Sequence, residues 1–199
     1  MAKYHGGAAQ EPAYAARASE GSVAAFNRAS ASHGALGADM AHQIRSSECE
    51  TRRTSRAFVS YFVNTSNGLT LTLRRRASRR NLAEFPGEFA PPVGELLLAR
   101  SSAGRELSCV GLRPLEISGT CEVKRLYLRA PARGTGVGCS LARSIAEIAD
   151  ALGYRQAMLD ALPTMRSAIA IYRKLGFAPM PPYWSNLPGI LCFAKQLSS

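Results

Sequence analysis

The chain has 199 residues, of which 46% are hydrophobic and 20% are charged, the balance of an ordinary globular protein. No apolar stretch approaches the roughly 20 residues of a membrane-spanning helix, and the N-terminus lacks the apolar region of a secretory signal. The formal net charge is +11, which favours anionic ligands or partners. We therefore expect a cytoplasmic protein with no membrane contact, built as one domain and an extension.

The numbers and positions of cysteine and histidine limit the kinds of metal site and nucleophile that the chain can form. The five cysteines are scattered and form no CxxC pair, which argues against a zinc site or a disulfide framework. The three histidines are His5, His33 and His42, so none lies after residue 42. This excludes Ser-His and Cys-His pairs from the rest of the chain, and we expect no bound metal.

Residues 1–42 differ in composition from the rest of the chain. They are dominated by Ala, Gly and Ser and show no sustained helical or strand period. Such a segment cannot bury enough apolar area to offset its ordering entropy. We expect a disordered extension at 1–42 and a domain at 43–199, with Met40 as an alternative start.

The first part of the domain combines weak elements with a strongly basic run. Residues 43–46 predict a short strand, apolar positions in 57–62 predict a helix, and residues 69–73 alternate Leu with Thr like a strand. Residues 74–80 then contain five arginines. Such a run is usually a solvated loop or helix end, although contact with nucleic acid or an acidic partner is an alternative.

The remaining elements occur at regular spacing. Residues 95–100, 107–112 and 120–128 predict three strands of an antiparallel meander. Two amphipathic helices come next, one ending at Gly153 and one starting from Thr164 as N-cap and ending at Gly176. Residues 154–160 and 190–197 predict further strands. The order indicates an α+β fold with a mixed, mainly antiparallel sheet flanked by helices.

A glycine-rich loop joins the third meander strand to the first helix, and its sequence is Arg133-Gly134-Thr135-Gly136-Val137-Gly138. Alternating glycines let a ligand approach the backbone, and the helix N-terminus adds N–H groups and a positive dipole. The loop therefore predicts a pyrophosphate site. A P-loop is excluded because the loop is not succeeded by Gly-Lys-Ser/Thr.

A Rossmann dinucleotide site remains an alternative for this loop, with Asp160 as its acidic residue. The glycines are spaced G-x-G-x-G rather than G-x-G-x-x-G, and five residues separate Leu128 from Gly134. Titration with NADH would test this alternative.

Two motifs in order resemble the core of the GCN5-related N-acetyltransferase (GNAT) superfamily, in particular its small bacterial-type members. The loop is similar to the family's R/Q-x-x-G-x-G/A motif, and residues 168–177 (AIAIYRKLGF) are similar to its A-I-x-L-Y-x-x-x-G-F segment. Residues 121–128 resemble the strand before the loop. The resemblance is strong over 81–197, faint over 43–80 and absent before 43.

The resemblance implies an acyl-CoA N-acyltransferase fold with acetyl-CoA as co-substrate. It further implies that a primary amine of a small molecule or peptide attacks the thioester directly in a ternary complex. A base must deprotonate the ammonium, backbone N–H groups must stabilise the oxyanion, and an acid should protonate the thiolate.

The family roles map onto named residues. Tyr172 corresponds to the family's acid, and Glu122 is the expected base, acting directly or through water, with Asp160 as a second candidate. Pairing of Glu122 with Lys124, on the same strand face, is the structural alternative. Tyr183 and Trp184 are expected to line the acceptor pocket. The expected cofactor contacts are the backbone of Leu126, Tyr127 and Leu128, then Arg133, Gly134, Thr135, Gly136, Val137, Gly138, Cys139 and Ser140.

The sequence also departs from the family. Many relatives carry Asn where this chain has Met165, and residues 64–80 are more basic than the segment that covers the acceptor site in relatives. The alternative function is a non-catalytic acyl-CoA-binding domain whose basic segment contacts nucleic acid or an acidic partner. Otherwise nucleic acid is not expected to bind, and the chain is expected to be a monomer or homodimer.

Overall fold

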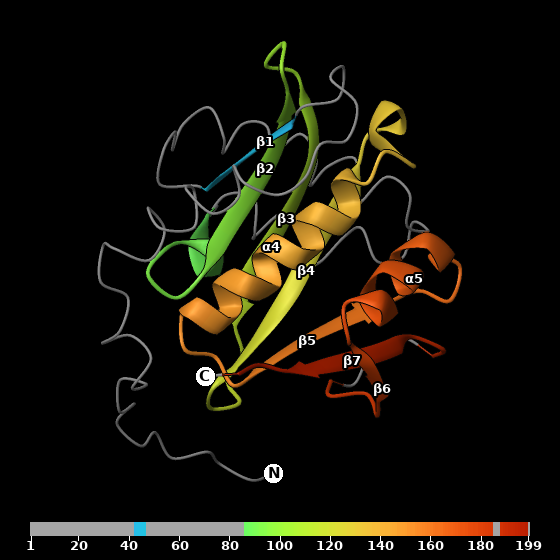
Figure 1. Ribbon diagram of the computed structural model, residues 1–199. Helices are drawn as coiled ribbons and strands as arrows, with labels where there is room; N and C mark the ends of the chain where they lie inside the picture. Colours follow the sequence, from blue (N-terminus) through green and yellow to red (C-terminus); the bar gives the residue numbers. More distant parts are fainter. Residues whose placement is uncertain (1–41, 47–85, 185–187, 199) are drawn as a thin grey trace, which may run out of the picture.

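A computed structural model describes residues 42–46, 86–184 and 188–198, the first of these by its backbone alone (Figure 1). Two short 3-10 turns, two α-helices and seven strands lie in these residues. In chain order they are β1 (His42–Ser46), η4 (Gly87–Phe89), β2 (Glu95–Ser101), β3 (Glu106–Pro114), β4 (Thr120–Leu128), η5 (Ala130–Ala132), α4 (Val137–Ala151), β5 (Gln156–Ala161), α5 (Arg166–Lys174), β6 (Ala178–Met180) and β7 (Leu191–Gln196).

Within the described residues the strands form one sheet in the order β1-β2-β3-β4-β5-β7-β6. Strands β2, β3 and β4 pair antiparallel in succession, which confirms the predicted meander. Strands β4 and β5 pair parallel, because α4 carries the chain back between them. The mixed, mainly antiparallel sheet of the predicted α+β class is confirmed.

Helix α4 lies across one face of the sheet, and α5 lies near β5 and β7 (Figure 1). The apolar stripe predicted for α4 is buried, with Leu141 and Ile145 fully enclosed. They pack in one core with residues of the sheet, including Leu97 and Leu112, and with Ile169 of α5. The apolar spacing thus predicted the buried face of α4, whereas α5 buries Ile169 and Tyr172, of which only Tyr172 belonged to its predicted stripe.

A second, smaller apolar cluster lies apart from this core. It consists of Phe89 from η4, Leu96 and Leu98 from β2 and Cys109 from β3, with Tyr127 packed against it. The alternation along β2 explains the division, because Leu97 belongs to the helix-covered core while its neighbours belong to the second cluster. Both faces of this strand are therefore buried.

Strand β4 changes character halfway along. Its pairing with β5 covers only Thr120 to Glu122, against Gln156 to Met158. Its pairing with β3 shifts register, since Gly111 opposes Lys124 while Cys109 opposes Tyr127. This is a bulge, and Arg125 within it has a φ of 64°. Beyond Glu122, β4 and β5 are no longer paired, which opens a gap in the sheet.

Two local predictions were wrong. Strand β6 was not predicted, because its three residues include a proline and show no alternation. Thr164 is not the N-cap of α5, which begins at Arg166 with Met165 as its N-cap.

The helix predicted in 57–62, the strand in 69–73 and the basic run at 74–80 lie outside the described residues. No helix in the described part is both long and apolar enough to cross a membrane.

A substitution at Gly94 tests how closely the chain before β2 packs against the backbone of η4. A Cβ at Gly94 would lie 2.5 Å from the carbonyl oxygen of Glu88 and 2.6 Å from the carbonyl carbon of Phe89, and backbone atoms cannot move aside. We expect Gly94→Ala to lower the free energy of unfolding by about 3 kcal/mol. Urea unfolding followed by circular dichroism would measure it.

Gly138→Ala is the matched control. Its Cβ would meet the tip of the Leu128 side chain at 2.9 Å, and that side chain can shift. Alanine also favours the helix, so we expect a loss of at most about 1 kcal/mol. Equal losses in the two variants would contradict the proposed packing of Gly94.

Candidate functional site

The glycine-rich loop connects β4 to α4 through the short turn η5. Gly134 and Gly136 have φ values of +77° and +88°, which L side chains rarely adopt. No atom of the described residues lies within 4 Å of a Cβ built at either position. These two glycines are therefore required by backbone conformation, and the backbone there faces open space.

The N-terminus of α4 is arranged to receive an anion. Gly136 is the N-cap, no side chain caps the helix and its first turn has no acidic residue. The N–H groups of the first turn, at Val137, Gly138 and Cys139, have no acceptor within the helix. With the helix dipole they form an anion site, as expected for a phosphate-bearing ligand.

Not every residue of the loop faces that site. A Cβ at Gly138 would lie 2.9 Å from the tip of the Leu128 side chain and 3.5 Å from Ile171, so this residue also packs α4 against β4 and α5. The Thr135 hydroxyl donates to the Ala132 carbonyl at 2.8 Å, and Arg133 Nε donates to the Leu128 carbonyl at 3.3 Å. Both side chains brace the loop itself.

The predicted pantetheine contacts lie along the gap. Leu126, Tyr127 and Leu128 belong to the part of β4 that has left β5. Tyr127 and Leu128 pair with β3 on the opposite side. Among the described residues no strand pairs with the β5 side of this segment, although the carbonyls of Tyr127 and Leu128 accept hydrogen bonds from the side chains of Ser108 and Arg133.

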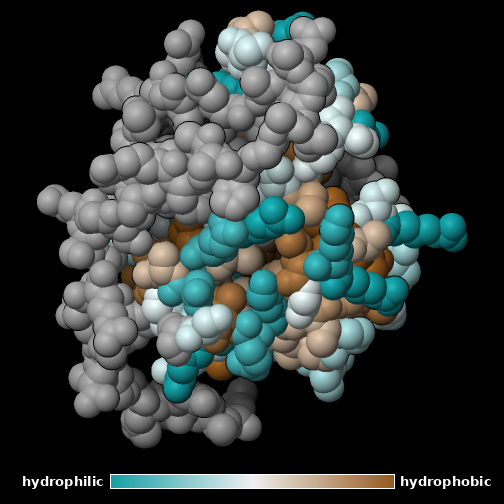
Figure 2. Space-filling model, in the orientation of Figure 1, coloured by the Kyte–Doolittle hydropathy of each residue, from teal (hydrophilic) through white to brown (hydrophobic). Residues whose placement is uncertain are grey.

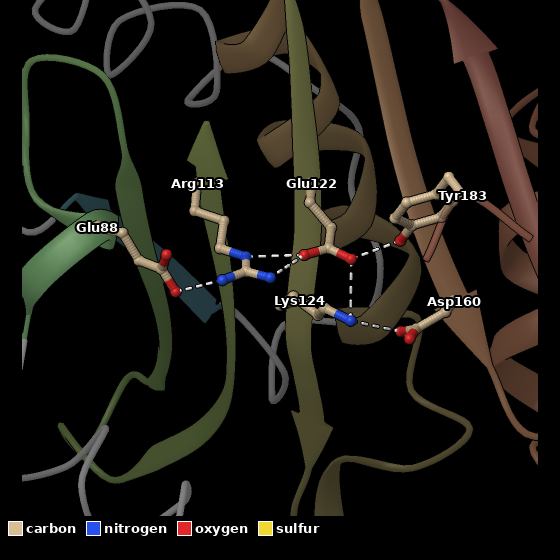
Figure 3. Close-up of polar contacts among 6 residues, drawn as sticks. All are labelled: Glu88, Arg113, Glu122, Lys124, Asp160 and Tyr183. Carbon is tan, nitrogen blue, oxygen red and sulfur yellow. Dashed lines mark hydrogen bonds and ion pairs between the residues drawn. The ribbon is translucent and has the colours of Figure 1, made fainter. Parts of the chain in front are cut away.

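A buried carboxylate, that of Glu122, stands where the gap begins (Figure 3). Its side chain is only 2% exposed. Oε2 accepts a hydrogen bond from Arg113 Nε at 2.7 Å and lies 2.6 Å from Arg113 Nη2. Oε1 accepts a hydrogen bond from the Tyr183 hydroxyl at 2.5 Å and pairs with Lys124 Nζ at 2.9 Å.

The contacts continue outward on both sides of Glu122 (Figure 3). Arg113 also forms an ion pair with Glu88 of η4. Lys124 also forms an ion pair with Asp160, 2.8 Å away on β5. We call these six residues the Glu122 network. The predicted pairing of Glu122 with Lys124 is confirmed, and the Lys124–Asp160 pair spans the gap between β4 and β5.

The pKa of Glu122 reflects this surrounding. Burial alone would raise it, but the charge of Lys124, the Tyr183 hydroxyl and the charge of Arg113 together outweigh burial. The pKa therefore lies below its ordinary value of 4.5. Glu122 is ionised at neutral pH, and both its oxygens are engaged.

The two predicted acceptor-pocket residues do lie at this network. Tyr183 reaches Glu122 directly, and the Trp184 ring lies with its centroid 5.1 Å from Lys124 Nζ. Trp184 is 39% exposed. On the face of the molecule drawn in Figure 2, hydrophilic and hydrophobic residues are intermixed over the described part. Burial and the Glu122 charge raise the pKa of Tyr183, so its hydroxyl stays protonated.

Tyr172 lies on α5 and is buried. Its ring packs edge-on against Phe177, with centroids 6.0 Å apart. Burial raises its pKa, and the negative charge of Asp160 raises it further. The phenol is therefore protonated at neutral pH.

Arg113 and Glu88 were missed from the sequence. The signal for Arg113 was present, because a hairpin register through residues 115–119 places it directly opposite Glu122. Opposite charges facing each other across antiparallel strands stabilise the pair. Nothing in the sequence indicated Glu88.

The comparisons with known proteins agree with this arrangement. The model of the acetyltransferase (GNAT) family matches residues 72–177. An uncharacterized N-acetyltransferase of Schizosaccharomyces pombe is 36% identical over 118 residues, which are 59% of this chain and 72% of that protein. An IAA acetyltransferase of Azospirillum brasilense is 34% identical over 95 residues, 48% of this chain and 61% of that protein.

Solved structures share the fold. An acetyltransferase of the GNAT family from Staphylococcus aureus superposes with a TM-score of 0.64 over 79% of this chain and 100% of its own, at 15% identity. The fold and site define an acyl-group transferase. The chain belongs to the acetyltransferase (GNAT) family, whose members use acetyl-CoA as co-substrate.

Stability should depend on Glu122 in a pH-dependent way. A carboxyl with a lower pKa in the folded state stabilises that state above its unfolded pKa, and this stabilisation is lost as pH falls through the folded pKa. Glu122→Gln also leaves Arg113 and Lys124 without their shared anion. We expect this variant to be about 3 kcal/mol less stable than the parent protein at pH 7.

The difference should shrink as the pH falls below 4.5, because a protonated Glu122 is as neutral as the glutamine. Denaturant unfolding at several pH values would measure it. A difference that stays constant down to the acid limit of folding would contradict the lowered pKa.

Proposed function

We propose that the chain is an acetyl-CoA-dependent N-acetyltransferase acting on a primary amine of a small molecule or peptide, by direct attack in a ternary complex. One observation carries the proposal. The unpaired edge of β4 leads through the glycine loop to the open N-terminus of α4. This arrangement suits a long ligand with a pyrophosphate, as acetyl-CoA is.

The cofactor roles are assigned from these positions. The backbone of Leu126, Tyr127 and Leu128 would bind the pantetheine arm along the gap. The pyrophosphate would lie against the loop and the first turn of α4, held by Arg133, Gly134, Thr135, Gly136, Val137, Gly138, Cys139 and Ser140. Arg133 and Thr135 contribute by bracing the loop as well as by any direct contact.

Tyr172 is proposed as the acid that protonates the leaving thiolate. The phenol carries its proton at neutral pH, and its raised pKa also makes it a weaker acid toward the thiolate than an exposed tyrosine. The buried ring is fixed by Phe177, so the hydroxyl does not need to be ordered at each turnover.

Glu122 is proposed to act on the acceptor ammonium, receiving its proton directly or through water. Its lowered pKa makes it a weak base but a permanent negative charge, which attracts the ammonium. Asp160 supplies a second carboxylate across the gap. Tyr183 and Trp184 would line the acceptor pocket, where an aromatic face favours a cation.

We also propose a cellular location and an oligomeric state. The four cysteines of the described residues are free thiols, which fits the reducing cytoplasm. We propose a monomer or homodimer with no nucleic-acid partner.

The first test is calorimetric titration with acetyl-CoA beside a free-thiol assay over a panel of amines. In Tyr172→Phe the ring packing survives but the proton donor is lost. We expect binding to be kept and turnover to fall on the order of 100-fold. Tyr154→Phe is the matched control, since Tyr154 is also buried and its hydroxyl donates to the Val93 carbonyl outside the site.

The control should lose about 1 kcal/mol of stability and keep its turnover. Binding without turnover on any amine would favour the alternative, a non-catalytic acyl-CoA-binding domain with a basic segment. Absence of binding would reject the assignment of the glycine loop.

The pH dependence gives a second test. Because the pKa of Glu122 lies below 4.5, Glu122 stays ionised across the neutral range. We expect kcat/KM to rise from about pH 6 to about pH 9 with the deprotonation of the acceptor amine. Amines of lower pKa should move the profile to lower pH. A profile fixed at one pH for all amines would identify a different titrating group in the protein.

A further inference from the structure

The Glu122 network already contains a primary amine, that of Lys124. Its Nζ lies 2.8 Å from Asp160 Oδ1, 2.9 Å from Glu122 Oε1 and 5.1 Å from the centroid of the Trp184 ring. Two carboxylates and an aromatic face are the groups that bind an ammonium ion. Lys124 therefore fills a cation site with the chain's own side chain (Figure 3).

The position of this amine on the fold is specific. Lys124 lies on β4 beyond Glu122, the last residue of β4 that pairs with β5. It lies two residues before Leu126, where the proposed pantetheine contacts begin. Its side chain reaches across the gap to Asp160 on β5.

Asp160 connects this amine with the proposed acid. It holds Lys124 by an ion pair, and its charge also helps to raise the pKa of Tyr172 after the larger effect of burial. Asp160 therefore acts through its charge on both the amine and the phenol. A thioester held along the gap at Leu126 would lie two residues along β4 from Lys124.

We propose that Lys124 is an internal acetyl acceptor, which takes one acetyl group from acetyl-CoA when no external amine occupies the site. The inference rests on the proposed function. Lys124 first loses a proton to Asp160 or Glu122, and the neutral Nζ attacks the thioester carbonyl carbon. The C–N bond forms, the C–S bond breaks and the thiolate takes a proton from Tyr172. The second proton of Nζ restores the Tyr172 phenol, and the proton on Asp160 or Glu122 passes to solvent. The products are Nε-acetyl-Lys124 and free CoA, with one proton released to solvent.

The reaction can occur only once in each chain, and it removes the positive charge of Lys124 from the site. An acetylated Lys124 is neutral and can no longer form ion pairs with Glu122 and Asp160. The two carboxylates then face a site without its resident cation, which an ammonium acceptor can enter. Because Lys124 must give up its ion pairs with Glu122 and Asp160 before it can attack, we expect self-acetylation to be slower than turnover of a good external amine.

The test uses the full chain incubated with acetyl-CoA and no amine, and then intact mass and peptide mass spectrometry. The chain has only four lysines, Lys3, Lys124, Lys174 and Lys195, so each can be quantified separately. We expect one acetyl group per chain, on Lys124. Its rate constant should not depend on protein concentration, because the transfer is within one chain.

Variants separate enzymatic transfer from chemical acetylation. Lys124→Arg keeps the cation and should lose the modification. Lys174→Arg, the matched control on α5, should keep it. Tyr172→Phe should slow acetylation of Lys124 by the same factor as turnover of external amines. An accepted amine should suppress labelling of Lys124 but not of Lys195.

The outcomes distinguish this inference from the proposed function. Turnover of external amines with no label on Lys124, or with label spread evenly over the lysines, would overturn the inference and leave the function standing. A rate that rises with protein concentration would also overturn it, since it indicates transfer between chains. If calorimetry detects no binding of acetyl-CoA, both the inference about Lys124 and the proposed function are wrong.

Discussion

The charge of Glu122 is buried within the sheet, and this constraint organises the site. A carboxylate so enclosed is stable only when cations and donors surround it. Arg113 meets it from the opposite strand, Lys124 from its own strand and Tyr183 from the segment after β6. Because Glu122 needs these partners, its burial favours the register that places Arg113 of β3 opposite Glu122 of β4. It also favours the position of the segment that carries Tyr183.

The two proposed binding sites differ in the groups that provide their charge. On the side of α4, backbone N–H groups and the helix dipole form an anion site, with no acidic side chain in the first turn. At the Glu122 network, carboxylates and an aromatic ring form a cation site. Backbone groups suit a ligand common to a whole family, whereas side chains suit an acceptor that differs between members.

The sequence predicted those parts of the molecule that depend on local patterns. The meander, α4 and the glycine loop were visible because alternation, helical spacing and glycine placement act over a few residues. Strand β6 was invisible because it depends on β7 for its pairing and has no pattern of its own.

The candidate site was predictable only in part, because it depends on contacts between distant residues. Tyr183 and Glu122 are 61 residues apart and Lys124 and Asp160 are 36 apart, so their meeting depends on the whole sheet. The packing of Gly138 against Leu128 was likewise not predictable, since it appears only when α4 is packed on β4.

The short pairing of β4 with β5 also has a mechanical meaning. Only three register pairs, from Thr120 to Glu122, join β1–β4 to β5–β7 at the closed end of the gap. Gly119 reinforces that end, where its carbonyl accepts hydrogen bonds from the N–H groups of Arg155 and Gln156. The two halves of the sheet therefore resemble the jaws of a clamp, with a hinge at Gly119 and the Lys124–Asp160 pair as a strut between them. Neutralising Lys124 would remove this ion pair and leave the Tyr183–Glu122 hydrogen bond and the pairing at Thr120–Glu122 in place.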